Sequence, residues 1–286
     1  MYALKQAGCV GLSNCRQPVV NSLILKRAFA YAATFDIRVF IEPDEHWLSI
    51  GGCAHEGKIA TRLGLKGIPV SAETIAIARA LELVAETGVS THFGRISSAQ
   101  GAALIERAKN QQLPVTADVS AHQLHLTEQD ISSYNSVCHV IPPLRTQRDM
   151  EALRNAVAND TIDAICSDHQ PHNLDAKQAP FASTEAGVST LETLLPLCLR
   201  LSRQAGLNLG TVIAKVTNSP ATILGIDAGT LSLGANADIC IFDEQEDWQM
   251  DAGCVHSHGK NTPFYGWNFQ GKVKHTIVDG KLLFSD

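Results

Sequence analysis

Long apolar runs, basic patches and closely paired cysteines are all missing from this 286-residue sequence. No apolar run reaches the roughly 18–20 residues that a membrane-spanning helix needs. Lysine and arginine form no basic stripe, and the formal net charge is −6, which argues against binding to nucleic acid or to a membrane surface. The 45% of hydrophobic and 18% of charged residues are ordinary for a globular domain.

The eight cysteines include no Cys-x-x-Cys pair, and most of them lie inside apolar runs. This pattern is typical of reduced, buried thiols in a cytoplasmic protein, and it argues against a disulfide framework or a structural zinc site. No secretory signal is visible after Met1, so we expect a cytoplasmic location.

Strand-like segments alternate with amphipathic helical segments along most of the chain. We expect strands near Val10, Val39, Thr91, Thr116, Val140 and Ala164. We expect helices at residues 18–35, 71–87, 98–110, 147–158, 190–204 and 209–215. This order predicts successive βα units and a parallel sheet. Six strands are too few for a closed (β/α)8 barrel, so we expect the barrel to be open at one side.

The pattern changes from Gly225 onward. Short strand-like segments, separated by hairpin-turn residues, occupy much of residues 229–284. We therefore divide the chain into a barrel part, residues 1–224, and a small β domain, residues 225–286.

The stretch from Asp163 to His172 carries the clearest signal for chemistry. Apolar residues run up to Asp168, and Pro171 cannot continue a central strand. Parallel α/β proteins present reactive side chains where their strands end, which favours a functional Asp168. The alternative is a strand end at which Asp168 only accepts hydrogen bonds from loop amides.

Three motifs point to a known family. They are Ser167-Asp-His-Gln-Pro-His172, Gly187-Val-Ser-Thr-Leu-Glu-Thr-Leu-Leu-Pro-Leu197 and Asn218-Ser-Pro-Ala221. Together they resemble the C-terminal half of dihydroorotases, amidohydrolase-superfamily enzymes that close carbamoyl aspartate into dihydroorotate.

The resemblance covers essentially the whole chain. It implies a TIM-type (β/α)8 barrel that lacks its first strands, with strands three to eight in residues 1–224. It also implies that residues 225–286 are the C-terminal part of a small β-sandwich. By the same comparison, the chain begins about 130 residues later than the family does.

The resemblance also assigns the site residues. Dihydroorotases bind divalent metal, which polarises the ring carbonyl and supplies hydroxide at neutral pH. The family's His-x-His ligands fall outside this chain, and three further ligand positions hold Cys15, Glu42 and Arg95. Asp168 is the one retained ligand and catalytic position, which we expect to be non-functional. His172 is retained from the substrate-binding set.

Arg95 decides the expectation for the metal. Cysteine and glutamate can hold a divalent ion, but a guanidinium has no lone pair to donate and stays protonated in proteins. Ile141 also replaces the asparagine that binds substrate in the family. We therefore expect no cofactor, with zinc only if the site is remodelled and active. We expect the Arg95 guanidinium to supply the positive charge between Asp168 and Glu42.

Several other histidines could build a different site. They are His92, His122, His125, His139 and His169. The alternative is that these imidazoles are hydrogen-bonded inside the barrel.

Residues 116–127 and 166–172 are most similar to the inactive dihydroorotase-like subunits that some bacteria keep beside aspartate carbamoyltransferase. This similarity implies a pseudoenzyme of pyrimidine synthesis, structural and regulatory, in an oligomer with the catalytic chain of that transferase. It implies no nucleic-acid or membrane partner. One alternative is an active zinc-dependent dihydroorotase or related cyclic-amide hydrolase. Another is a small-molecule binding module in which His172 and Arg145 face an anion.

Overall fold

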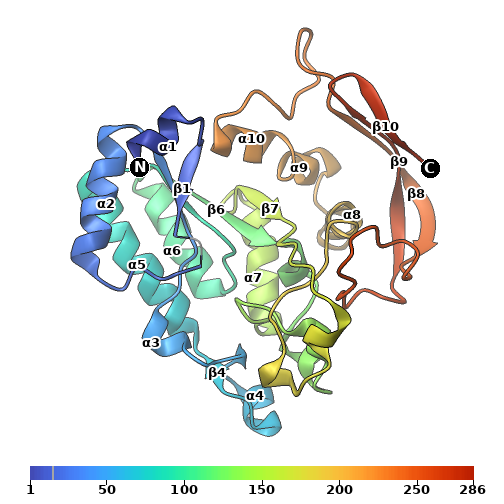
Figure 1. The fold of residues 1–286 in the computed structure, drawn as a ribbon, viewed down its shortest axis with the longest axis horizontal. Coiled ribbons are helices and arrows are strands. Elements are labelled where there is room, and N and C mark those ends of the chain that lie inside the picture. Colours follow the sequence, from blue (N-terminus) through green and yellow to red (C-terminus); the bar gives the residue numbers. More distant parts are fainter. Residues whose placement is uncertain (15) are drawn as a thin grey trace.

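The computed structural model describes residues 1–14 and 16–286. Its centre is a five-stranded parallel sheet in the order β1-β2-β5-β6-β7 (Figure 1). The strands are β1 (Gly11–Ser13), β2 (Arg38–Ile41), β5 (Thr91–Phe93), β6 (Val115–Ser120) and β7 (Ala164–Cys166). Strands β2 and β5 are rich in β-branched and aromatic residues, which suits a buried parallel sheet.

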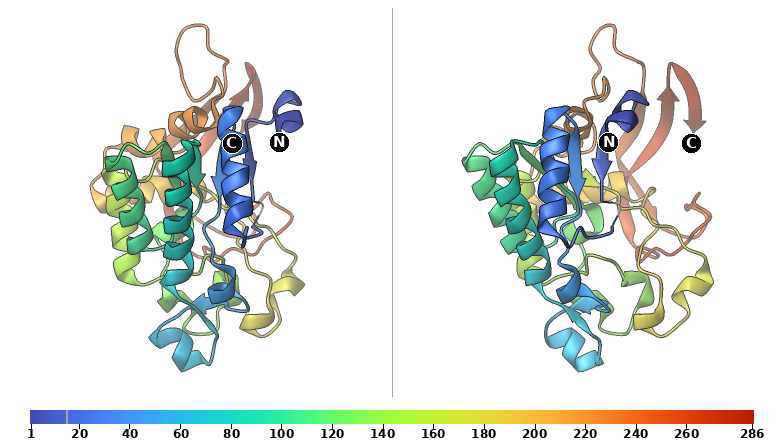
Figure 2. Two further views of the ribbon diagram at one scale, coloured as in Figure 1. Left: turned by 90° about the vertical axis from the view of Figure 1, so that its left-hand side faces the viewer. Right: turned by 60° about the vertical axis from the view of Figure 1, so that its left-hand side comes forward.

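Four helices follow these strands along the chain and pack side by side on one face of the sheet (Figure 2). They are α2 (Ser22–Thr34), α5 (Val70–Thr87), α6 (Ala99–Asn110) and α7 (Gln147–Ala158). Local sequence sets their ends. Asn21 accepts hydrogen bonds from the first amides of α2, Thr146 and Asp149 form a capping box at α7, and Gly88 ends α5 with φ of 69°.

Smaller elements fill the remaining connections. Between β2 and α5 lie α3 (His46–Ser49), β3 (Ala54–His55), α4 (Lys58–Leu63) and β4 (Gly67–Ile68). The 3-10 helices are η1 (Ala121–Leu124), η2 (Glu128–Ile131), η3 (Ser136–Cys138), η4 (Leu174–Lys177) and η5 (Phe181–Ser183). The remaining helices are α1 (Tyr2–Gln6), α8 (Leu194–Ala205), α9 (Leu209–Ala214) and α10 (Asn218–Leu224). In the part of the chain with coordinates, none of the helices has the length and apolar character of a membrane span.

A three-stranded antiparallel sheet forms the C-terminal part of the molecule, in the order β8-β9-β10. Its strands are β8 (Ile239–Gln249), β9 (Asn268–Val278) and β10 (Lys281–Ser285). Helix α8 packs against β9, and α10 ends at Gly225, where φ is 67°. The barrel part is thus joined to this sheet through α8 as well as along the chain.

The expected strand near Val140 was wrong. The chain forms the 3-10 helix η3 just before this position, and β6 pairs directly with β7. Pro142 and Pro143 follow at once, and proline has no N–H to give to a ladder, so this segment cannot lie in the middle of a sheet. Residues 1–14 and 16–224 therefore contain five strands of the main sheet rather than six. The expected helices at 18–35 and 190–204 begin later, at Ser22 and Leu194.

Strand β1 is at the edge of the main sheet, as expected for a barrel open at one side. Its free edge leaves backbone N–H and C=O groups available to another chain. We expect the 286-residue chain, made alone, to self-associate as its concentration rises, and light scattering coupled to size exclusion would measure this. Val10→Lys, at a half-exposed residue beside the edge, should reduce the association because charge disfavours edge pairing. A monomer at every concentration would contradict the prediction.

Candidate active site

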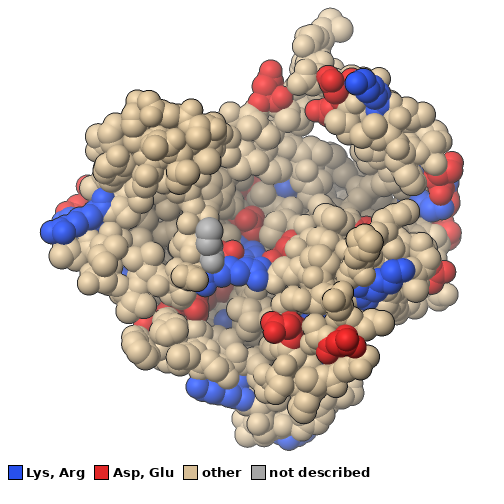
Figure 3. All heavy atoms as spheres, viewed as in Figure 1, with Lys and Arg blue, Asp and Glu red and all other residues tan. Residues whose placement is uncertain are grey.

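The C-terminal ends of the parallel strands bring four charged side chains together. Glu42 directly follows β2, Arg95 lies two residues after β5, and Asp168 lies two residues after β7. Arg16 joins them from the chain just after β1. We call these four residues the charge cluster. Figure 3 shows basic and acidic atoms side by side in the hollow at the middle of this face.

The cluster alternates guanidinium and carboxylate groups. Arg95 Nη1 donates to Asp168 Oδ1 at 3.1 Å, and Arg95 Nη2 donates to Glu42 Oε2. Arg16 Nη2 donates to the same Asp168 oxygen at 3.3 Å, and Arg16 Nε lies 3.7 Å from Glu42 Oε2. The contact expected from the sequence, Arg95 with both carboxylates, is confirmed. The sequence motifs did not predict that Arg16 joins this cluster. The one feature that could have indicated it is its position directly after Cys15, which stands at a ligand position of the family. Cys15 itself lies outside the described residues.

Burial makes the Arg95–Asp168 pair the strongest part of the cluster. Their side chains are 10% and 5% exposed, whereas Arg16 is 47% exposed. Burial by itself lowers the pKa of Arg95, but the carboxylates of Asp168 and Glu42 outweigh it, and the pKa lies above its ordinary value. Arg95 is therefore a fixed cation.

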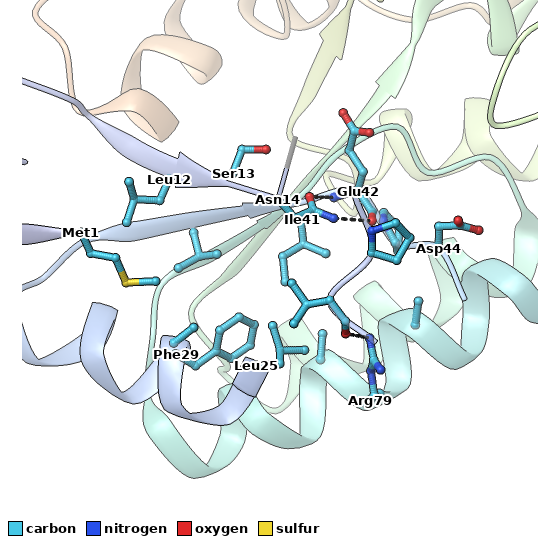
Figure 4. A pocket seen from close by; sticks show the side chains of 17 residues that line it. Met1, Leu12, Ser13, Asn14, Leu25, Phe29, Ile41, Glu42, Asp44 and Arg79 are labelled. Carbon is cyan, nitrogen blue, oxygen red and sulfur yellow. Dashed lines mark hydrogen bonds between the residues drawn. The ribbon is translucent and has the colours of Figure 1, made fainter. Parts of the chain in front are cut away.

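Glu42 is held in place from β1. Its backbone N–H donates to Asn14 Oδ1 at 3.1 Å, and Asn14 Nδ2 donates back to the Glu42 carbonyl at 3.5 Å (Figure 4). The same view shows a hollow of about 110 Å³ between the sheet and the helices, into which Leu12, Leu25 and Phe29 project. This hollow is lined mainly by apolar side chains, and Glu42 is the member of the charge cluster that lines it.

A buried layer lies beneath the cluster and centres on Asp118. Its Oδ1 accepts from the Arg95 backbone N–H at 2.8 Å, and its Oδ2 is hydrogen-bonded to His92 Nε2 at 2.8 Å. Burial by itself raises the pKa of Asp118. These hydrogen bonds together outweigh burial, so the pKa lies below its usual value. Burial and the nearby carboxylates of Asp118 and Asp168 raise the pKa of Cys166 well above that of a free thiol. Cys166 is thus a protonated, unreactive thiol.

Three residues of the cluster have backbone conformations that are rare outside glycine. The φ angles of Arg16, Arg95 and Asp168 are 61°, 57° and 49°. Each such residue costs about 1–3 kcal/mol and persists only where surrounding structure imposes it. Here the imposed backbone directs all three side chains into one hollow.

The described side chains do not fit the metal site of the related enzymes. Glu42 and Asp168 both have an oxygen bound by guanidinium groups, and Arg95 stands at a ligand position without a lone pair. Within residues 1–14 and 16–286, no group of three His, Cys, Asp or Glu side chains could hold a metal ion. No catalytic step through a metal can be built from these residues.

The other histidines do not converge on the cluster as a set. His125 Nε2 is hydrogen-bonded to the Leu197 carbonyl at 2.9 Å, and His139 Nδ1 to Thr184 Oγ1 at 2.8 Å. His169 Nδ1 accepts from the Thr190 N–H at 3.0 Å. These three imidazoles, with His92, are hydrogen-bonded in the interior, as one alternative expected.

His122 and His172 differ from that set. His122 is 1% exposed, and neither ring nitrogen has a hydrogen-bond partner in the described chain. Burial lowers its pKa, so the ring is neutral. His172 Nε2 is hydrogen-bonded to the Ala186 carbonyl at 3.0 Å, and its backbone N–H donates to Asn261 Oδ1 at 2.7 Å. The substrate-binding role of His172 stays a prediction.

Comparison with known proteins identifies the family. The model of the amidohydrolase family matches residues 49–283. The dihydroorotase-like protein of Pseudomonas aeruginosa is 45% identical over 99% of this chain and 66% of its own length. The dihydroorotase of Geobacter sp. strain M21 is 38% identical over 99% of this chain and 67% of its own length. The chain therefore spans about two thirds of the length of these relatives.

The solved structures lead to the same fold. L-hydantoinase (dihydropyrimidinase) from Arthrobacter aurescens superposes with a TM-score of 0.89 and 25% identity, over 99% of this chain and 66% of that one. The expected TIM-type α/β barrel with a C-terminal β-sheet is confirmed. The chain belongs to the amidohydrolase family.

Proposed function

We propose that this chain is a non-catalytic, dihydroorotase-like protein of pyrimidine synthesis. Its role is structural and regulatory, as a cytoplasmic partner that holds the catalytic chain of aspartate carbamoyltransferase in an oligomer. The similarity to dihydroorotases and to dihydroorotase-like proteins supports the link to pyrimidine chemistry. The partner is proposed from the resemblance of residues 116–127 and 166–172 to the inactive subunits.

A single observation carries the non-catalytic part of the proposal. Arg95 donates to Asp168, and the resemblance to dihydroorotases assigns both residues to metal-ligand positions, of which Asp168 alone keeps its ligand. A cation beside the retained carboxylate repels a divalent ion and occupies the oxygen that would bind it. Ile141 adds to this, because its side chain cannot hydrogen-bond a substrate ring.

The purified chain should convert neither dihydroorotate nor carbamoyl aspartate, with or without added zinc. It should also contain far less than one equivalent of zinc by elemental analysis, because the donor set offers no closed metal site. The Geobacter dihydroorotase, assayed in parallel, supplies the positive control.

Two outcomes would overturn parts of this proposal separately. Turnover that disappears in Asp168→Asn would show an active cyclic-amide hydrolase with a remodelled site. Failure to co-elute with a co-expressed aspartate carbamoyltransferase catalytic chain would leave the chain inactive but remove the proposed partner.

A further inference from the structure

Beside the charge cluster lies a cleft of about 200 Å³, open between the chain after β2 and residues 141–145. Its apolar wall includes Pro43, Ile68, Ala72, Ile141, Pro142 and Pro143. Arg16 and Arg95 also line it, but both guanidinium groups are engaged by Asp168 and Glu42. Arg145 and Asp44 line the same cleft and take part in none of these ion pairs.

Arg145 is a fixed cation in the wall of this cleft. It is 2% exposed, its Nε donates to Ser97 Oγ at 3.1 Å, and its Nη1 donates to the Ile68 carbonyl at 2.7 Å. Nη1 also contacts His55 Nδ1 at 3.1 Å. The third nitrogen, Nη2, has no hydrogen-bond partner among the described residues. A guanidinium has five N–H donors, and Nη2 is not one of the enclosed atoms that lack a partner among the described residues, so its donors are accessible from the cleft. An anionic group in the cleft would pair it.

Asp44 supplies the opposite charge in the same cleft. Its Oδ2 accepts from Ser49 Oγ at 2.8 Å, while Oδ1 has no partner in the described chain. Burial raises the pKa of Asp44, and the hydrogen bond from Ser49 and the charges of His46 and Arg145 offset only part of that rise. Asp44 and Arg145 influence one another's charge but form no ion pair among the described residues. Asp44 and Arg145 thus line one small cleft without forming an ion pair, and Arg16, Glu42, Glu73 and Arg95 line it as well.

We propose that this cleft binds a small zwitterion of the amino-acid class, with its carboxylate on Arg145 and its ammonium group on Asp44. A carboxylate accepts from the guanidinium, and an ammonium group has three donors for carboxylate oxygens, so one ligand satisfies both walls. A ligand with a single charge leaves one of the two wall charges unpaired, which reduces its affinity. The volume admits only a compact molecule. The cleft binds such a ligand whether or not the chain joins an assembly.

Isothermal titration of the complete 286-residue chain tests this directly. Glycine, β-alanine and γ-aminobutyrate place the two charges at increasing separation, and acetate and methylammonium each carry one charge. At least one of the three zwitterions should bind, and the two singly charged probes should bind at least about tenfold more weakly. The charge separation of the zwitterion that binds most tightly indicates the distance between the charged groups of Asp44 and Arg145.

Substitutions then locate the site. Asp44→Asn keeps an oxygen for Ser49 but removes the charge, and it should weaken zwitterion binding by about tenfold or more. Arg145→Gln should abolish it, and if that buried substitution prevents folding, Asp44→Asn decides alone. Asp227→Asn makes the same charge change at an exposed residue away from the cleft and should have no effect. No zwitterion binding up to about 50 mM, equal binding of acetate, or binding unchanged in Asp44→Asn would overturn the proposal.

Discussion

Arg95→Met should lower the free energy of unfolding by about 3 kcal/mol, the lower end of the range of about 3–5 kcal/mol for breaking a buried ion pair. Methionine keeps much of the length of arginine but leaves Asp168, whose side chain is 5% exposed, without its buried cation. Arg16 and Gln170 still donate to Asp168, which is why the lower end applies. Urea unfolding at low micromolar protein would measure the change.

Two further variants separate the ion pair from general damage. Arg148→Met removes an exposed arginine from α7 and should change stability by less than about 0.5 kcal/mol. The double variant Arg95→Met with Asp168→Asn removes both buried charges, so it should be more stable than Arg95→Met alone. A double variant less stable than either single one would show that Asp168 does not depend on Arg95 for compensation.

Acidification from pH 7 to pH 5 should destabilise the chain by about 3–5 kcal/mol through histidines in its interior, His122 among them. Burial, with a nearby cation in each case, lowers the pKa of His55 to about 4, of His125 to about 3 and of His139 to about 4. The unfolded pKa is about 6.5, so below that pH the unfolded chain binds protons that the folded chain does not. The stability that these neutral histidines contribute is therefore fully present above about pH 6.5. It is lost as the pH falls toward their pKa values in the folded chain.

Urea unfolding at several pH values and constant ionic strength would measure this loss. His125→Gln removes one of the contributing groups and should make the dependence on pH shallower. His256→Gln, at an exposed histidine, should leave it unchanged. Stability that does not vary between pH 7 and pH 5 would mean that these imidazoles titrate normally in the folded chain.

The sequence allowed much of the barrel part to be predicted, because its helices have amphipathic periods and clear end signals. The expected helix at 147–158 has the same bounds as α7. The capping box marks its first residue, and the last apolar turn marks its end. The strand near Val140 was mistaken because a short apolar run looks the same in a strand and in a buried loop. The two prolines that follow it were the signal against a strand.

The site was predictable where a motif fixed a position, and less so elsewhere. The pairing of Arg95 with Asp168 and Glu42 followed from charge compensation at three positions of the family's metal site. The contact of Arg16 did not follow, because it depends on a positive φ angle that arginine rarely adopts. One alternative already had Arg145 facing an anion, but the place of Asp44 in the same cleft could not be foreseen, since it depends on which donor and acceptor atoms remain unpaired after folding.

Under the proposed non-catalytic function, the charge cluster makes metal binding hard to gain by single mutations. Arg95→His alone would supply an imidazole but would take the buried cation from Asp168, and Cys15 and Glu42 would still differ from the ligands of the related enzymes. The first step back would therefore lose stability before any activity could be gained. A protein with a margin of about 5–15 kcal/mol tolerates few such steps. Under the proposed function, the arginine that keeps a metal ion out also stabilises the barrel, so selection for stability alone would retain it.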